Sequence, residues 1–120
     1  MGLRDAYFSK LERKREAEEA AERPYHEAHA RLKALHHEIV ADRALMDSIL
    51  AEVELTGDAL QIDPGPIFIR VAVDHAGDYH MTYEIKSHDD PKIVDVPVKS
   101  IPDIEEAVAD LLVKYARERD

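Results

Sequence analysis

Histidines are the side chains of this sequence whose number and spacing first suggest chemistry. Seven occur in 120 residues, and four of them lie close together, at His26, His29, His36 and His37. If this segment is helical, His26 and His29 have a spacing that allows both to bind one ion, and Glu22 precedes His26 by one turn. A catalytic zinc site usually needs three protein ligands, so a second helix or chain would have to complete such a site.

The same spacing favours a simpler interpretation of most of these histidines. His29 and His36 share one line along a helix, but they are two turns, roughly 10 Å, apart, which is too far to bind one ion together. We therefore interpret the histidines as polar residues that flank a helical seam, with pH-sensitive assembly as a variant. No cofactor is predicted, and only His26 and His29 remain as candidate metal ligands.

Carboxylates and hydroxyls do not form a recognisable catalytic pattern. Residues 74–78 and 87–90 combine carboxylates with a histidine, but Asp, Gly and His are common in turns, and neither stretch has the ligand order of an EF-hand loop. The sequence contains no GxSxG elbow, P-loop, glycine-rich dinucleotide loop or HExxH helix. It also contains no cysteine, which excludes disulfides and thiolate chemistry. The chain is therefore predicted not to be an enzyme.

The element that must position the histidines is a long amphipathic helix. Apolar residues recur at steps of three and four, interrupted only at Asp42, and they are Tyr25, Ala28, Leu32, Leu35, Ile39, Met46, Ile49 and Val53. A helix of roughly 30 residues extends about 45 Å, which is longer than a globule of this size. It therefore needs a partner, which could be the folded-back N-terminal segment, a second copy of the chain or another protein.

We accordingly predict a surface for binding a protein partner or a second copy, most simply as a homodimer. The predicted surface comprises Tyr25, Leu32, Leu35, Ile39, Asp42, Met46 and Ile49. Asp42 has a special role in it, because an isolated polar residue in an apolar seam fixes the register at some cost in stability.

Pro24 divides the N-terminal half of the chain. It lacks an N–H and disfavours helical geometry at the residue before it. The sequence predicts helices at about 3–22 and 24–55, which form either a hairpin or one kinked long helix within a helical arm, 1–55. The first helix begins with a short amphipathic stretch formed by Leu3, Tyr7, Phe8 and Leu11.

The apolar period changes from helical to two-residue after Gly57. Alternation at 67–73, 79–86 and 94–98 predicts three strands in an antiparallel meander. Pro97 cannot donate a ladder hydrogen bond, so the third strand is expected at the sheet edge.

A final helix is predicted to begin at Ser100, with Asp103 in position to complete a capping box. Its apolar stripe should pack on one face of the sheet. The predicted fold class is thus α+β, with 56–120 forming a βββα body that belongs to one cooperative domain with the helical arm.

Charge is concentrated in the C-terminal half. The net charge is −10, and residues 56–120 carry 14 acidic against seven basic side chains, whereas residues 1–23 carry six of each. An acidic surface is predicted on the last helix, at Asp103, Glu105, Glu106 and Asp110. Such a field repels phosphates, so nucleic acid is not expected as a direct partner, whereas a basic protein would suit it.

These observations favour a small acidic, non-enzymatic interaction or regulatory protein that assembles through its long helix. The alternative is a phage-type inhibitor whose carboxylates mimic nucleic acid, and a histidine metal-binding helical protein is less favoured. No apolar run approaches the ~20 residues of a membrane span, and residues 1–10 lack the apolar stretch of a signal peptide. We therefore expect no membrane partner and a cytoplasmic location.

Overall fold

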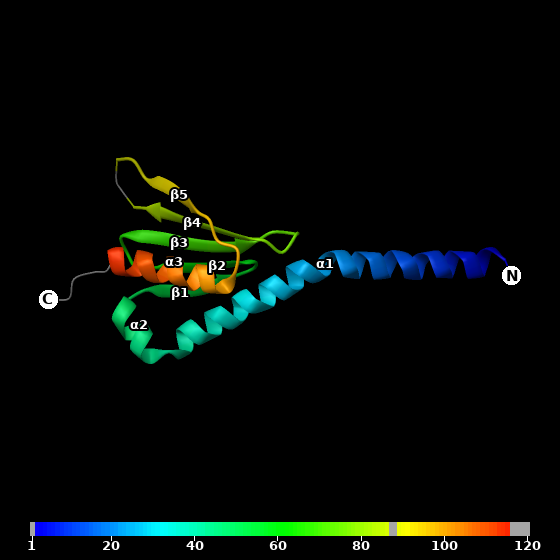
Figure 1. The fold of residues 1–120 in the computed structure, drawn as a ribbon, viewed down its shortest axis with the longest axis horizontal. Coiled ribbons are helices and arrows are strands. Elements are labelled where there is room, and N and C mark those ends of the chain that lie inside the picture. Colours follow the sequence, from blue (N-terminus) through cyan, green and yellow to red (C-terminus); the bar gives the residue numbers. More distant parts are fainter. Residues whose placement is uncertain (1, 87–88, 116–120) are drawn as a thin grey trace.

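The computed structural model describes residues 2–86 and 89–115. Figure 1 shows a long N-terminal helix, a sheet and a C-terminal helix packed on that sheet. The elements follow in the order α1 (Leu3–Ala41), α2 (Arg43–Ile49), β1 (Glu52–Thr56), β2 (Ala59–Asp63), β3 (Ile67–Val73), β4 (Tyr79–Ile85), β5 (Lys92–Val96) and α3 (Ile101–Lys114).

The sheet is a five-stranded antiparallel meander in the order β1-β2-β3-β4-β5. The expectation of three strands is therefore wrong, although the α+β class is confirmed. The two additional strands, β1 and β2, occupy residues that were expected to form the end of a helix and a loop.

Local sequence explains the extra hairpin. In β1, polar and apolar residues alternate from Glu52 to Thr56, and the apolar ones are the half-buried ones. Gly57 and Asp58 then form a two-residue turn, with Gly57 at φ 60°, and Thr56 pairs with Ala59 across it. Two-residue hairpin loops favour glycine at such positive φ angles because it has no side chain to clash.

The helical region is one bent rod followed by a short helix, and not a hairpin. α1 continues through Pro24, and Figure 1 shows the rod changing direction between its N-terminal and C-terminal halves. Asp42 interrupts the rod and caps α2, since its Oδ1 accepts a hydrogen bond of 3.1 Å from the Leu45 N–H. α2 ends at Ile49, and the residue that caps it, Leu50, adopts the left-handed conformation at φ 50°.

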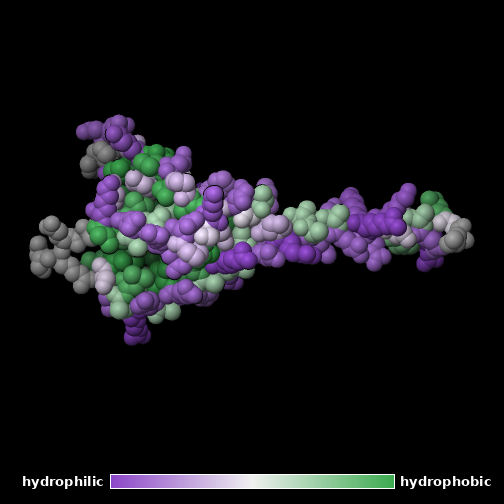
Figure 2. All heavy atoms as spheres, in the orientation of Figure 1, coloured by the Kyte–Doolittle hydropathy of each residue, from purple (hydrophilic) through white to green (hydrophobic). Residues whose placement is uncertain are grey.

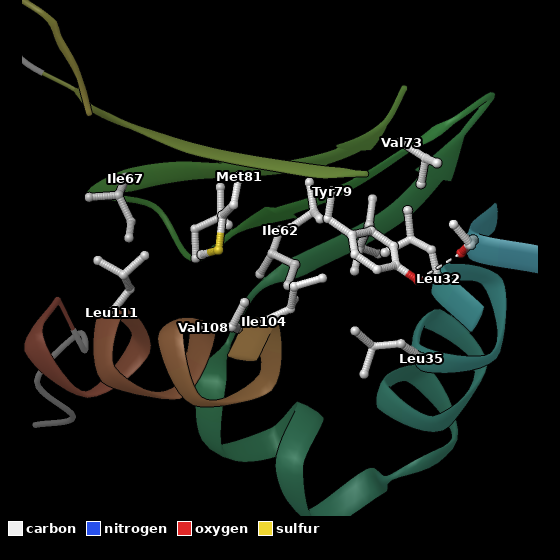
Figure 3. Close-up of a cluster of buried hydrophobic side chains, with 14 residues drawn as sticks. Leu32, Leu35, Ile62, Ile67, Val73, Tyr79, Met81, Ile104, Val108 and Leu111 are labelled. Carbon is white, nitrogen blue, oxygen red and sulfur yellow. Dashed lines mark hydrogen bonds between the residues drawn. The ribbon is translucent and has the colours of Figure 1, made fainter. Parts of the chain in front are cut away.

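The hydrophobic core lies between one face of the sheet and two helices. α1 contributes Leu32 and Leu35, and α3 contributes an apolar stripe that faces the same strands (Figure 3). The buried residues from the sheet and α3 include Leu60, Ile62, Ile67, Ile69, Val71, Val73, Tyr79, Met81, Ile104, Val108 and Leu111. The partner of the long helix is thus, in its C-terminal half, the chain's own sheet.

The molecule is strongly elongated. Its Cα radius of gyration is 19.8 Å and its principal extents are 79 × 34 × 20 Å, whereas a compact domain of this length has a radius of gyration of about 14 Å. The cause is visible in Figure 1, where the N-terminal half of α1 projects away from the rest. None of the helices in the described part of the chain combines the length and apolarity that a membrane crossing requires.

Candidate functional site

The projecting part of α1, residues 3–23, is called the arm below, and the rest of the described chain is called the body. Within residues 3–23 no side chain is buried, and only Leu11 is half-buried. The first residue of α1 that the sheet buries is Ala28, which is 3% exposed. The arm therefore presents helix surface that the chain itself does not cover.

The tip of the arm carries exposed apolar side chains. Leu3 is 86% exposed, and Tyr7 and Phe8 are 58% and 55% exposed. The rings of Tyr7 and Phe8 meet edge to face at 5.4 Å, and the Arg4 guanidinium lies 5.8 Å from the Phe8 ring centre. Green atoms mark this tip in Figure 2, beyond a predominantly purple shaft. The predicted association surface does not include these tip residues, although the spacing of Leu3, Tyr7, Phe8 and Leu11 indicates an amphipathic helix.

Charge divides the shaft of the arm into two blocks. Basic side chains gather at Lys10, Arg13, Lys14 and Arg15, and acidic ones at Glu16, Glu18, Glu19 and Glu22. The blocks touch within the helix through one exposed ion pair, Lys14 Nζ to Glu18 Oε1 at 4.0 Å. An exposed i,i+4 pair contributes only about 0.3–0.5 kcal/mol, so most of this charge is available to a partner.

A groove of about 710 Å³ lies where the arm joins the body. Tyr25 forms part of it and packs among imidazoles, with ring centres 5.8 Å from His29 and 6.4 Å from His75. The full lining consists of Ala21, Glu22, Tyr25, His26, Asp58, Val73, Asp74 and His75. The groove thus combines an aromatic wall with several carboxylates.

The predicted association residues divide between the core and the surface. Leu32 and Leu35 are 0% and 5% exposed, so they are held inside the chain. Tyr25, Ile39, Met46 and Ile49 are half-buried, and Asp42 is exposed at the cap of α2. The structure therefore places the centre of the predicted surface in the core, and it leaves the arm as the uncovered part of the helix.

A second groove runs between the end of α1, α2 and α3. It is apolar and small, about 180 Å³, and its lining comprises Leu35, Ile39, Leu45, Ile49, Ile62, Glu105, Val108, Ala109 and Leu112. Two predicted association residues, Ile39 and Ile49, lie here. The groove offers an apolar surface but almost no polar group that could orient a ligand.

The predicted acidic surface is exposed on α3. Asp103 also has a structural role there, because its Oδ2 accepts a hydrogen bond of 3.0 Å from the Lys99 N–H while its own N–H donates to Ser100 Oγ. Glu105, Glu106 and Asp110 are exposed on the helix. Three outward carboxylates and one capping carboxylate are thus spread over about two turns.

The histidine candidates for metal binding have other contacts. His29 Nε2 lies 2.8 Å from the Gly57 carbonyl oxygen, which ties α1 to the β1–β2 turn. His26 Nε2 lies 3.6 Å from Glu22 Oε2, and both groups are exposed. Over residues 2–86 and 89–115, no three His, Asp or Glu side chains are grouped in a way that could hold a metal ion.

The β3–β4 turn forms a small charge network beside the junction. Asp74 Oδ1 accepts hydrogen bonds from the N–H groups of Ala76 and Asp78, and its Oδ2 lies 2.7 Å from His80 Nε2. The hydrogen bond with His80, followed by the two backbone N–H bonds, lowers the pKa of Asp74. These bonds stay within the β3–β4 hairpin and explain the Asp74 carboxylate without a ligand.

One buried hydroxyl connects α1 to β4. Tyr79 Oη donates a hydrogen bond of 3.1 Å to the Ala28 carbonyl oxygen, shown as a dashed line in Figure 3. Burial raises the pKa of Tyr79, and the positive charge of Arg31 opposes this shift. The bond fixes the helix to the sheet at the point where the arm begins.

The sequence matches no protein-family model, and no significant similarity to a curated protein or a solved structure was found.

Proposed function

We propose that this chain is a non-enzymatic interaction protein that engages another protein chain through the arm, residues 3–23 of α1. The observation that carries the proposal is the arm itself, a stretch of 21 helical residues that the body does not cover and that ends in exposed Leu3, Tyr7 and Phe8. Large apolar side chains grouped at one exposed place are typical of binding surfaces.

A protein partner fits the arm better than nucleic acid does. The arm is electrically balanced but divided into a basic and an acidic block, whereas the whole chain carries a net charge of −10. Nucleic-acid affinity depends mainly on lysine and arginine contacts with phosphates. The acidic block of the arm and the negative charge of the whole chain would both repel phosphates. We place the interaction in the cytoplasm as part of the same proposal, supported by the charged composition of the chain.

The proposal is tested by photo-crosslinking in cells. A photoreactive amino acid at Tyr7 should capture a discrete protein, and the same group at Val113, an 80% exposed residue of α3, serves as the control on the body. Leu11→Ser, which interrupts the apolar face of the arm, should reduce the adduct at position 7. The absence of any protein adduct at position 7, or an adduct indifferent to Leu11→Ser, would show the proposal to be wrong.

A further inference from the structure

We infer that the partner of the arm is the arm of a second copy of this chain, paired antiparallel, with each tip seated in the other copy's junction groove. This inference rests on the proposed function and specifies its partner. It is argued from the order of charges along the arm, the spacing of its apolar residues and the place where the body begins.

The order of the charged blocks selects the orientation. The basic block, Lys10, Arg13, Lys14 and Arg15, contains one acidic residue, Glu12, and remains net positive, whereas the acidic block, Glu16, Glu18, Glu19 and Glu22, contains no basic residue. In a parallel pair each block would face the same block of the other copy and repel it. In an antiparallel pair the basic block of one arm faces the acidic block of the other, twice over, because the pair has twofold symmetry.

The spacing of residues selects the register. Tyr7, Leu11, Lys14, Glu18, Ala21 and Tyr25 follow one another at alternating steps of four and three, which is the seam spacing of a two-stranded coiled coil. When Lys14 lies level with Glu18 of the second copy, Leu11 lies level with the second copy's Ala21. The same register brings Tyr7 level with the second copy's Tyr25. One register therefore pairs the opposite charges and also brings the apolar residues of the two arms together.

The position of the body limits how far the two arms can overlap, and this limit agrees with the register above. In this register Leu3, the first residue of α1, lies level with His29 of the second copy, next to Ala28, the first residue of α1 that the sheet buries. A tip that extended further would meet the body. The length of the exposed helix and the register favoured by its side chains thus agree, although they are independent properties of the chain.

The junction groove is complementary to the tip that this pairing delivers. Tyr25 and Ala21 supply apolar surface, and Glu22, Asp58 and Asp74 supply carboxylates along the lining. The incoming tip carries Leu3, Tyr7 and Phe8 together with the cation of Arg4. Pairing would cover the exposed apolar tip and fill the groove in both copies.

Charge exchange tests the electrostatic part of the inference in purified protein. One variant replaces Lys10, Arg13, Lys14 and Arg15 with Glu, and the other replaces Glu16, Glu18, Glu19 and Glu22 with Lys. Sedimentation equilibrium should show a dimer for the natural chain and self-association weakened by at least about tenfold for each variant alone. An equimolar mixture of the two variants should form a heterodimer, because opposite blocks face each other again.

Cysteine crosslinking tests the orientation, and the chain offers a clean background because it contains no cysteine. A mixture of Lys14→Cys and Glu18→Cys should form a disulfide between copies on oxidation, because these two seam positions lie level in the antiparallel register. Leu11→Cys alone should not, whereas a mixture of Leu11→Cys and Ala21→Cys should. Efficient crosslinking of Leu11→Cys with itself would establish a parallel pair and overturn the inference.

All substituted positions lie on the uncovered arm, so the body should keep its melting temperature, and circular dichroism of each variant checks this. A natural chain that sediments as a monomer throughout the micromolar range overturns the pairing. If position 7 nevertheless captures a different protein in cells, the proposed function stands without self-pairing. If position 7 captures no protein, both the self-pairing and the proposed function are wrong.

Discussion

Tyr79 is one of the residues that hold α1 to the sheet, together with His29 and the buried Leu32 and Leu35. Replacing Tyr79 with Phe removes the hydroxyl that donates to the Ala28 carbonyl and leaves that oxygen only its hydrogen bond in the helix. We expect Tyr79→Phe to lower the free energy of unfolding by about 1–2 kcal/mol, measured by urea denaturation. The matched control is Tyr7→Phe at the exposed tip, which should change the free energy of unfolding by less than about 0.5 kcal/mol.

Asp74 and His80 provide a prediction about protonation. The pKa of Asp74 lies below its ordinary value of 3.8 in the folded chain, with the hydrogen bond to His80 as the largest cause. A depressed carboxylate pKa stabilises the fold above pH 3.8, and this contribution is lost as the pH falls through the folded-state pKa. His80→Ala should therefore raise the pKa of Asp74 in an NMR titration.

His75→Ala is the control for that titration, because His75 occupies the same turn but has no hydrogen bond to Asp74 in the structure. It should leave the pKa of Asp74 nearly unchanged. An equal shift in both variants would contradict the assignment of the effect to His80.

At the scale of single residues, local interactions were predictable from the sequence and distant ones were not. The pattern of Ser100 and Asp103 predicts a capping box, and Ser100 Oγ does accept the Asp103 N–H, but the Asp103 carboxylate accepts from the Lys99 N–H instead of from Ser100. The bond between Tyr79 and Ala28 joins residues 51 positions apart. No local pattern specifies such a contact, because it depends on how two elements pack.

The β3–β4 hairpin and α1 meet at the bend of the rod. A Cβ added to Gly77 would lie 2.5 Å from the Pro24 carbonyl oxygen, and Gly77 has φ +84°, which side chains rarely adopt. Gly77→Ala should therefore destabilise the chain by more than the cost of the backbone angle alone, about 1–2 kcal/mol. Thermal unfolding followed by circular dichroism measures the loss.

Gly57 separates the two causes. It also has a positive φ, +60°, but nothing lies within 4 Å of a Cβ at that position. Gly57→Ala should show only the backbone cost, so a smaller loss than Gly77→Ala is expected. If Gly57→Ala and Gly77→Ala lose the same free energy of unfolding, the close contact with Pro24 does not contribute to the loss.

Long elements were predictable and short ones were ambiguous. β3 and β4 each alternate over seven residues and were predicted correctly. β1 has only five residues, and Val53 also continues the helical repeat from Ile49, so the helical period was preferred there. The turn at Gly57 and Asp58, between two alternating stretches, was the available signal for a hairpin.

Stability should reside almost wholly in the body, although α1 belongs to both parts of the molecule. Leu35 is 5% exposed in the core, and Leu35→Ala should reduce the free energy of unfolding by about 2–5 kcal/mol. Leu3 is 86% exposed at the tip, and Leu3→Ala should leave the unfolding of the body unchanged. Guanidinium denaturation of the two variants at low protein concentration checks the difference.

The candidate site was only partly predictable at the scale of the whole molecule. The sequence showed that the long helix needed a partner, but it did not show that the sheet would cover the half containing Leu32 and Leu35. Apolar periodicity measures how much a residue can gain from burial, and it does not tell which surface will bury it. The tip, with fewer apolar residues, is therefore the part that remains exposed.

We expect Pro24 to divide the long helix into two units that unfold separately. Proline has no N–H, so one hydrogen bond of the helical ladder is missing there, and most helical stability in proteins comes from tertiary packing, which the arm lacks. The arm can therefore unwind while the body stays folded. Amide protons of residues 3–20 should exchange with solvent much faster than those of residues 28–41, and their protection should grow with protein concentration as the arms pair.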